Sequence, residues 1–141
     1  CPAPTVAPEA ELPRVLPDGV SLCATRIPLL AATKQGLLDS LQHAYQAGAL
    51  LAQARVDVIG FLCTTATLAR GAEFDRQFAE QMQRQTGIRT VTTAAAAVAA
   101  LSHLEARRVV VATPYAAELN AMEKQFLEHE GFEVAAIEDL A

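Results

Sequence analysis

The chain has 141 residues, 52% of them hydrophobic and 19% charged, and a formal net charge of −5. The length suits one domain with a substantial core, and the composition excludes an intrinsically disordered chain. The acidic balance, without a cluster of basic residues, argues against a nucleic-acid partner, because phosphate binding needs a localised positive surface. No apolar run reaches the roughly 18 residues of a transmembrane helix, so no membrane partner is expected.

Prolines and turn residues dominate the start of the chain, and apolar periodicity follows. Five prolines in the first 17 residues predict a loop with about one helical turn. The alternation over 20–27 predicts a strand. Thr33 is expected to cap a long helix that reaches about Leu51. The near-continuous apolar run over 56–62 predicts a parallel strand that is buried on both faces.

The second half continues this alternation of strands and helices. Helices are predicted over 72–85, closed by Gly87, over 94–104, capped by Thr93, and over 116–130. Short strands are predicted over 88–92, 108–112 and 132–137. The order predicts an α/β fold with a parallel sheet flanked by helices on both faces. Neither GxGxxG nor a P-loop motif is present, so no nucleotide cofactor is indicated.

Both ends of the chain favour a truncated protein. Cys1-Pro2-Ala3-Pro4 is typical of a loop that follows a strand, and the last predicted strand is followed by only four residues. We therefore expect a fragment of a longer α/β protein, with a complete small protein as the alternative. The three cysteines include no CxxC pair, which predicts free thiols and suits a reducing cytoplasm.

Cys63 is the leading candidate for chemistry, because it lies at the carboxyl end of a predicted strand, where α/β sheets bind ligands. The thiolate is the reactive form of cysteine, and backbone N–H groups of a following helix lower a thiol pKa. Thr64 and Thr65 would offer donors to a carboxylate or a developing oxyanion. From the residues alone, an inert buried cysteine remains the alternative.

Other polar residues give weaker signals. Tyr115 follows a strand and could donate a hydrogen bond to an anion, although a partly buried loop aromatic explains it equally. Arg26 is better explained by a structural salt bridge than by an anion site. The histidines lie in predicted helices without metal-ligand spacing, so no metal is predicted. The acidic residues of the helix over 72–85 are expected to form a solvated face: Glu73, Asp75 and Glu80.

Several motifs occur together in an order that resembles one family: Pro8-Glu9, Thr25-Arg26-Ile27-Pro28-Leu29, Val56-Asp57-Val58-Ile59-Gly60 before Cys63-Thr64-Thr65, Arg107-Arg108-Val109-Val110-Val111-Ala112-Thr113-Pro114-Tyr115, and Gly131-Phe132-Glu133-Val134. The chain resembles the maleate cis-trans isomerase and arylmalonate decarboxylase group of the aspartate/glutamate racemase superfamily. The resemblance covers nearly the whole chain. It implies two similar Rossmann-like α/β domains with the active site between them, and a homodimer. Residues 1–106 would then be most of the first domain, without its first strand, and residues 107–141 the start of the second.

The resemblance also implies roles for individual residues. Cys63 matches the nucleophilic cysteine of the isomerases, where the decarboxylases carry glycine. Thr64 and Thr65 match positions that hold a substrate carboxylate, and Tyr115 matches a tyrosine with the same task. No cofactor is implied. A second catalytic cysteine is expected beyond residue 141.

The function implied is the cofactor-independent cis-trans isomerisation of a small dicarboxylate such as maleate. An amino-acid racemase or an arylmalonate-type decarboxylase is the alternative within the superfamily. A non-catalytic dicarboxylate-binding relic is a third reading, because alanines stand where the family usually has polar donors: Ala3, Ala94 and Ala95.

Overall fold

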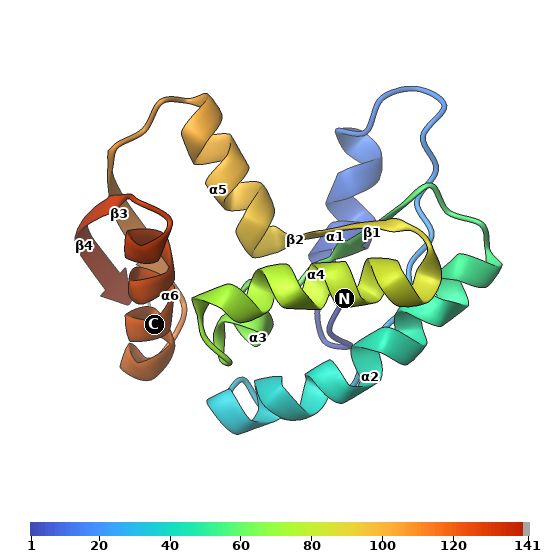
Figure 1. The fold of residues 1–141 in the computed structure, drawn as a ribbon, viewed down its shortest axis with the longest axis horizontal. Coiled ribbons are helices and arrows are strands. Elements are labelled where there is room, and N and C mark those ends of the chain that lie inside the picture. The colour runs from blue at the N-terminus through green and yellow to red at the C-terminus, as the bar shows by residue number, and fades with distance from the viewer. Residues whose placement is uncertain (140–141) are drawn as a thin grey trace.

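The computed structural model describes residues 1–139 and places two small parallel sheets among helices (Figure 1). In chain order the elements are α1 (Ala7–Glu11), the 3-10 helix η1 (Leu12–Arg14), α2 (Lys34–Gln53), β1 (Val58–Phe61), α3 (Thr64–Leu68), α4 (Ala72–Thr86), β2 (Arg89–Thr92), α5 (Thr93–His103), β3 (Arg108–Thr113), α6 (Ala117–His129) and β4 (Glu133–Asp139). None of these helices is long and apolar enough to cross a membrane.

The strands pair in parallel, as the alternation predicts. The predicted burial of the strand over 56–62 on both faces is wrong, because Val58 is 56% exposed and the buried residues of β1 are the alternate ones, Ile59 and Phe61. Strand β1 pairs with β2 so that Phe61 lies opposite Thr92, and β3 pairs with β4 so that Arg108 lies opposite Glu133. The α/β class with helix-flanked parallel strands is therefore confirmed, with the difference that the described strands form two sheets. The predicted domain boundary at residue 106 falls between α5 and β3 and stays a prediction.

The strand predicted over 20–27 is wrong. Within this segment, Ile27 alone takes part in strand pairing, through an isolated parallel bridge to Pro2. The apolar side chains of this segment do not all find an apolar layer to pack against, since Val20 is 54% exposed. A strand needs a hydrogen-bonded neighbour as well as a pattern, and the described residues supply one at Ile27 only.

The helix ends follow local chemistry. The hydroxyl of Thr33 caps α2 by accepting from the Gly36 N–H at 3.2 Å, and Gly87 closes α4 in the left-handed region at a φ of 72°; both predictions are confirmed. The predicted cap of α5 is wrong by one residue. Thr92 has the extended backbone of a cap and accepts from the Ala95 N–H at 3.0 Å, so Thr93 is already helical.

Two hydrophobic cores form, and α3 contributes to both. The first packs α2 and α4 on β1, with the rings of Phe61 and Phe78 at a centroid distance of 4.6 Å. The second packs α5 and α6 on the β3–β4 sheet. Ala66 belongs to the first core and Leu68 to the second. The short helix that follows Cys63 is therefore held between them.

Gly48 explains how α2 and α4 pack so closely. Glycine inside a helix costs about 1 kcal/mol relative to alanine. A Cβ atom at this position would lie 2.2 Å from the Sδ atom of Met82 on α4, a side chain that is itself buried. The absence of a side chain at Gly48 is thus what allows the contact.

We predict that Gly48→Ala lowers the free energy of unfolding by about 1–3 kcal/mol, because overpacking outweighs the gain in helix propensity. Urea unfolding of the single variant measures this change. In a Met82→Ala background the added methyl group has room, so the same substitution should be neutral or stabilising there. A stabilised single variant would contradict the packing argument.

Candidate functional site

Cys63 lies at the junction between β1 and α3. It is the residue that caps α3, with an extended backbone at φ −151° and ψ 97°, and its side chain is partly buried against the first core. The helix begins at Thr64, directly after the cysteine. The first N–H groups of α3 therefore lie beside the sulfur.

Burial and hydrogen bonds shift the pKa of the Cys63 thiol in opposite directions. Burial raises the pKa of Cys63 above its ordinary value. Hydrogen bonds from the Ala66 N–H and from the hydroxyl and N–H of Thr65 lower it again, by less than burial raises it. The donors predicted from the sequence are thus present, but the neutral thiol is the resting form. Reaction requires that its proton be removed.

Tyr115 comes to the same place from the other sheet. It lies in the loop between β3 and α6, and its hydroxyl is hydrogen-bonded to the side chain of Thr64. Burial raises the pKa of Tyr115, with further contributions from Glu123 and Cys63. All four residues singled out in the sequence therefore lie together, and the β1–α3 and β3–α6 junctions supply them.

The loop that carries Tyr115 is fixed by buried polar contacts. The Tyr115 N–H donates to the hydroxyl of Thr113 at 3.1 Å. That hydroxyl in turn donates to the Asn120 side-chain oxygen at 2.5 Å. Thr113 and Asn120 are both buried, so this chain of bonds fixes the backbone from which the Tyr115 side chain extends.

The hydroxyl groups differ in what they can still bind. Thr65 is buried and already donates to the Cys63 sulfur. Thr64 and Tyr115 are only partly buried and are bonded to one another. The arrangement offers one nucleophile and a pair of hydroxyl donors beside it, which suits addition to an electrophilic carbon that carries a carboxylate. The predicted task of each threonine and of Tyr115 in substrate binding stays a prediction.

Glu123 was missed by sequence reasoning. Its Oε2 atom is buried and has no hydrogen-bond partner among the described residues. Burial raises the pKa of its carboxyl group, and its charge acts on Tyr115. The residue lies on α6, four positions after Leu119 and three before Phe126, so its helical spacing from these apolar residues was the available signal.

Arg26 is occupied by structure. It forms an ion pair with Glu9, and its Nη1 atom donates to the carbonyl oxygens of Ala3 at 2.7 Å and Thr5 at 2.9 Å. This confirms the structural salt bridge as its role. Within residues 1–139, no three His, Cys, Asp or Glu side chains gather in a way that could hold a metal ion.

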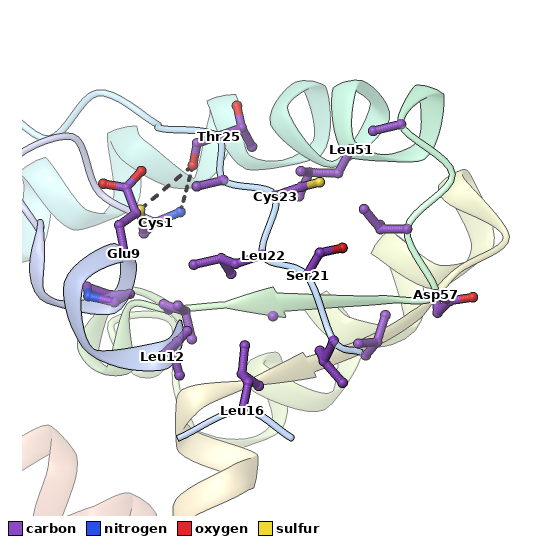
Figure 2. Close-up of a pocket in the computed structure, with 18 of the residues that line it drawn as sticks. Cys1, Glu9, Leu12, Leu16, Ser21, Leu22, Cys23, Thr25, Leu51 and Asp57 are labelled. Atoms are coloured by element: carbon purple, nitrogen blue, oxygen red, sulfur yellow. Dashed lines mark hydrogen bonds between the residues drawn. The ribbon is translucent and has the colours of Figure 1, made fainter. Parts of the chain in front are cut away.

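A separate hollow of the described chain lies elsewhere (Figure 2). It has a volume of roughly 540 Å³ and separates the N-terminal segment from β1. Gly60 and Leu62 line it, whereas the alternate residues Ile59 and Phe61 point into the protein. None of the four candidate residues lines this cavity, so we assign it no part in the chemistry.

Comparison with known proteins places the chain in a family. The model of the arylmalonate decarboxylase family matches residues 1–141. The maleate isomerase of Pseudomonas putida KT2440 is 27% identical over an alignment of 145 positions, which covers 94% of this chain and 58% of that protein. A cysteine-to-alanine variant of the maleate isomerase from Pseudomonas putida S16, solved with maleate, is 28% identical and superimposes with a TM-score of 0.94, covering 99% of this chain and 61% of that one.

A second solved relative comes from Nocardia farcinica. It is a cysteine-to-serine mutant of a maleate cis-trans isomerase with a covalently bound succinylcysteine intermediate. It is 26% identical, with a TM-score of 0.93, and the match covers 99% of this chain and 60% of that one. The chain thus spans about three fifths of the length of these relatives. Because the family model matches the whole sequence, the chain belongs to the arylmalonate decarboxylase family, in the group that also contains the maleate isomerases.

Proposed function

We propose that the complete protein is a cofactor-independent cis-trans isomerase of a small dicarboxylate such as maleate, and that Cys63 is its nucleophile. The observation that carries the proposal is the placement of the Cys63 thiol, beside N–H donors of α3 and next to the Thr64–Tyr115 hydroxyl pair. Two relatives support it, since one was solved with maleate and the other holds a succinylcysteine.

The first step is addition to the alkene. The Cys63 thiolate forms a C–S bond to one alkene carbon, and the π electrons move to the other carbon and its carboxylate. The result is an enediolate-like species in which the former double bond is single. Protonation of that carbon would give a saturated succinyl-cysteine, the adduct seen in the Nocardia relative.

Rotation and expulsion complete the reaction. The single bond turns by about half a revolution, the electron pair re-forms the alkene, and the C–S bond breaks to return the thiolate. The trans isomer leaves, and no atom is gained or lost overall. Hydroxyl donors from Thr64 and Tyr115 would stabilise the charge that develops on the carboxylate, a contact worth about 3 kcal/mol per donor.

Generation of the thiolate is the demanding part of this scheme. Burial favours the neutral thiol, so the substrate-free site keeps Cys63 protonated near neutral pH. Thr65 and the Ala66 N–H lower the cost of ionisation. A second cysteine, which the resemblance to the family places after residue 141, would exchange the proton.

We further propose that the site lies between two α/β units, with residues 1–106 in the first and 107–141 in the second. The separate β1–β2 and β3–β4 sheets support this division, as does the origin of Cys63 and Tyr115 in different halves. A homodimer in the cytoplasm would follow the family pattern, and three free cysteines suit that compartment.

We predict that Cys63→Ala in the complete protein lowers maleate turnover by at least about three orders of magnitude, because the nucleophile is lost. The matched control is Cys23→Ala, which removes an exposed thiol and should leave turnover unchanged. Fumarate formation followed by NMR measures the rate. Aspartate, glutamate and a 2-arylmalonate, tested in parallel, separate isomerase from racemase and decarboxylase. Near-wild-type turnover in Cys63→Ala would overturn the assignment.

We predict that Tyr115→Phe lowers kcat for maleate by about 10²-fold, since it deletes one donor to the developing charge. Tyr45→Phe is the control, because Tyr45 packs against Phe78 in the first core. Steady-state kinetics of both variants give the comparison. An equal effect of the two substitutions would mean that Tyr115 acts through stability alone.

We predict that the alkylation of Cys63 by iodoacetamide has a higher pH midpoint in the folded protein than in urea, because burial raises the pKa of this thiol. Thr65→Val should raise the folded midpoint by about one further unit, since a hydrogen bond to the thiolate is lost. A raised pKa leaves less thiolate at a given pH, so alkylation below the midpoint should slow. Mass mapping distinguishes Cys63 from the other cysteines. An alkylation midpoint in the folded protein equal to the midpoint in urea would contradict the conclusion that burial raises the pKa of Cys63 more than the hydrogen bonds lower it.

A further inference from the structure

The burial of Asp75 differs clearly from what the sequence predicts. Glu73 and Glu80 of the same helix are exposed as expected, but Asp75 is 4% exposed, so its place on a solvated face is wrong. Burial of a carboxylate costs several kcal/mol unless its oxygens are hydrogen-bonded. Its Oδ1 atom accepts from the Thr67 hydroxyl at 2.5 Å and its Oδ2 atom from the Thr92 hydroxyl at 2.6 Å.

The two hydroxyl partners belong to different parts of the fold. Thr67 lies on α3, four residues after Cys63, and is itself completely buried. Thr92 ends β2 and caps α5 through the Ala95 N–H. The single carboxylate of Asp75 therefore ties the helix that follows Cys63 to the carboxyl end of the neighbouring strand.

A further hydrogen bond fixes the chain on the N-terminal side of Cys63. The Thr93 hydroxyl donates to the carbonyl oxygen of Phe61 at 3.1 Å. Phe61 ends β1, two residues before the cysteine. The segments before and after Cys63 are thus both anchored to the β2–α5 junction at Thr92 and Thr93.

Helix α3 depends on such anchors. It has five residues, and isolated helices of this length are unstable in water. Its position is therefore set by its burial between the two cores and by the Thr67–Asp75 bond. The Thr65 and Ala66 donors to the Cys63 sulfur belong to this helix, so a shift of the helix moves them away from the sulfur.

We propose that Asp75 is a positioning residue for Cys63: its carboxylate, bonded to Thr67 and Thr92, holds α3 and its donors against the sulfur. Asp75 is buried and would act on Cys63 through its hydrogen bond with Thr67. Its effect on turnover rests on the proposed function, whereas its effect on the thiol does not.

The test is the pH dependence of Cys63 alkylation in the complete protein, with iodoacetamide as the probe. Thr67→Val removes the bond to α3 and leaves Asp75 bonded to Thr92, and Asp75→Leu removes both bonds. Thr90→Val is the matched control, because this β2 hydroxyl is similarly buried but bonds only to the nearby Ile88 carbonyl.

None of these variants alters Tyr115, the ionisable side chain that interacts with Cys63. They also leave Arg76 and Arg89 in place beside Asp75. A change in the pH midpoint therefore reports the donors to the thiolate. A change in the plateau rate at high pH reports access to the sulfur.

We expect Thr67→Val and Asp75→Leu to raise the midpoint by about half a unit or more, in the direction of Thr65→Val, because donors to the thiolate are displaced. Thr90→Val should leave it unchanged. If Asp75→Leu does not fold, Thr67→Val decides alone. An unchanged midpoint in Thr67→Val, or an equal rise in Thr90→Val, overturns the proposal. A specific rise without maleate turnover in the wild type supports the positioning role and rejects the isomerase.

Discussion

The site depends on the packing of one five-residue helix between two hydrophobic cores. Helix α3 gives Ala66 to the core under β1 and Leu68 to the core on the β3–β4 sheet. A helix this short takes its position from its surroundings. The same packing places its first N–H groups beside Cys63 and its Thr64 hydroxyl beside Tyr115. Stability and chemistry are therefore set by the same contacts.

This packing creates a conflict at the sulfur that the hydrogen bonds only partly relieve. The burial that orders α3 also removes water from Cys63 and raises its pKa. A site of this kind keeps its thiol neutral, and so less exposed to oxidation, until a proton acceptor is present. The hydrogen bonds from Thr65 and Ala66 offset part of the rise in pKa. They lower the free energy needed to form the thiolate, but the neutral thiol stays the resting state.

Sequence reasoning succeeded where local chemistry decides the outcome. Thr33 and Gly87 mark helix ends because capping needs only residues a few positions apart. The position of Cys63 was predicted for a related reason, since an apolar run followed by hydroxyl residues indicates the end of a strand, and Cys63 does lie between β1 and α3. Its catalytic role stays a prediction. The family resemblance then pointed to the same position.

Sequence reasoning failed where the position of a residue depends on partners that are distant in the chain. The burial of Asp75 requires Thr67 and Thr92, which come from α3 and the end of β2, and nothing near Asp75 in the chain indicates them. Residues 20–27 show the reverse case, a strand-like pattern with pairing at Ile27 alone. The proximity of Tyr115 to Thr64 also depends on how α6 packs on α3, and it was implied by the family resemblance and not by periodicity.

The donors that residues 1–139 bring to Cys63 are hydroxyl and amide groups, and this has a consequence for the proposed catalysis. A cation would attract both carboxylates of the proposed substrate strongly from the start, and uniform binding of this kind lowers KM without raising kcat. A fixed hydroxyl gains most where negative charge increases, which in the proposed addition is the enediolate oxygen. Its benefit depends on being held in place before the charge develops. The buried chain from Asn120 through Thr113 to the Tyr115 backbone supplies that rigidity on one side, and Asp75 supplies it on the other.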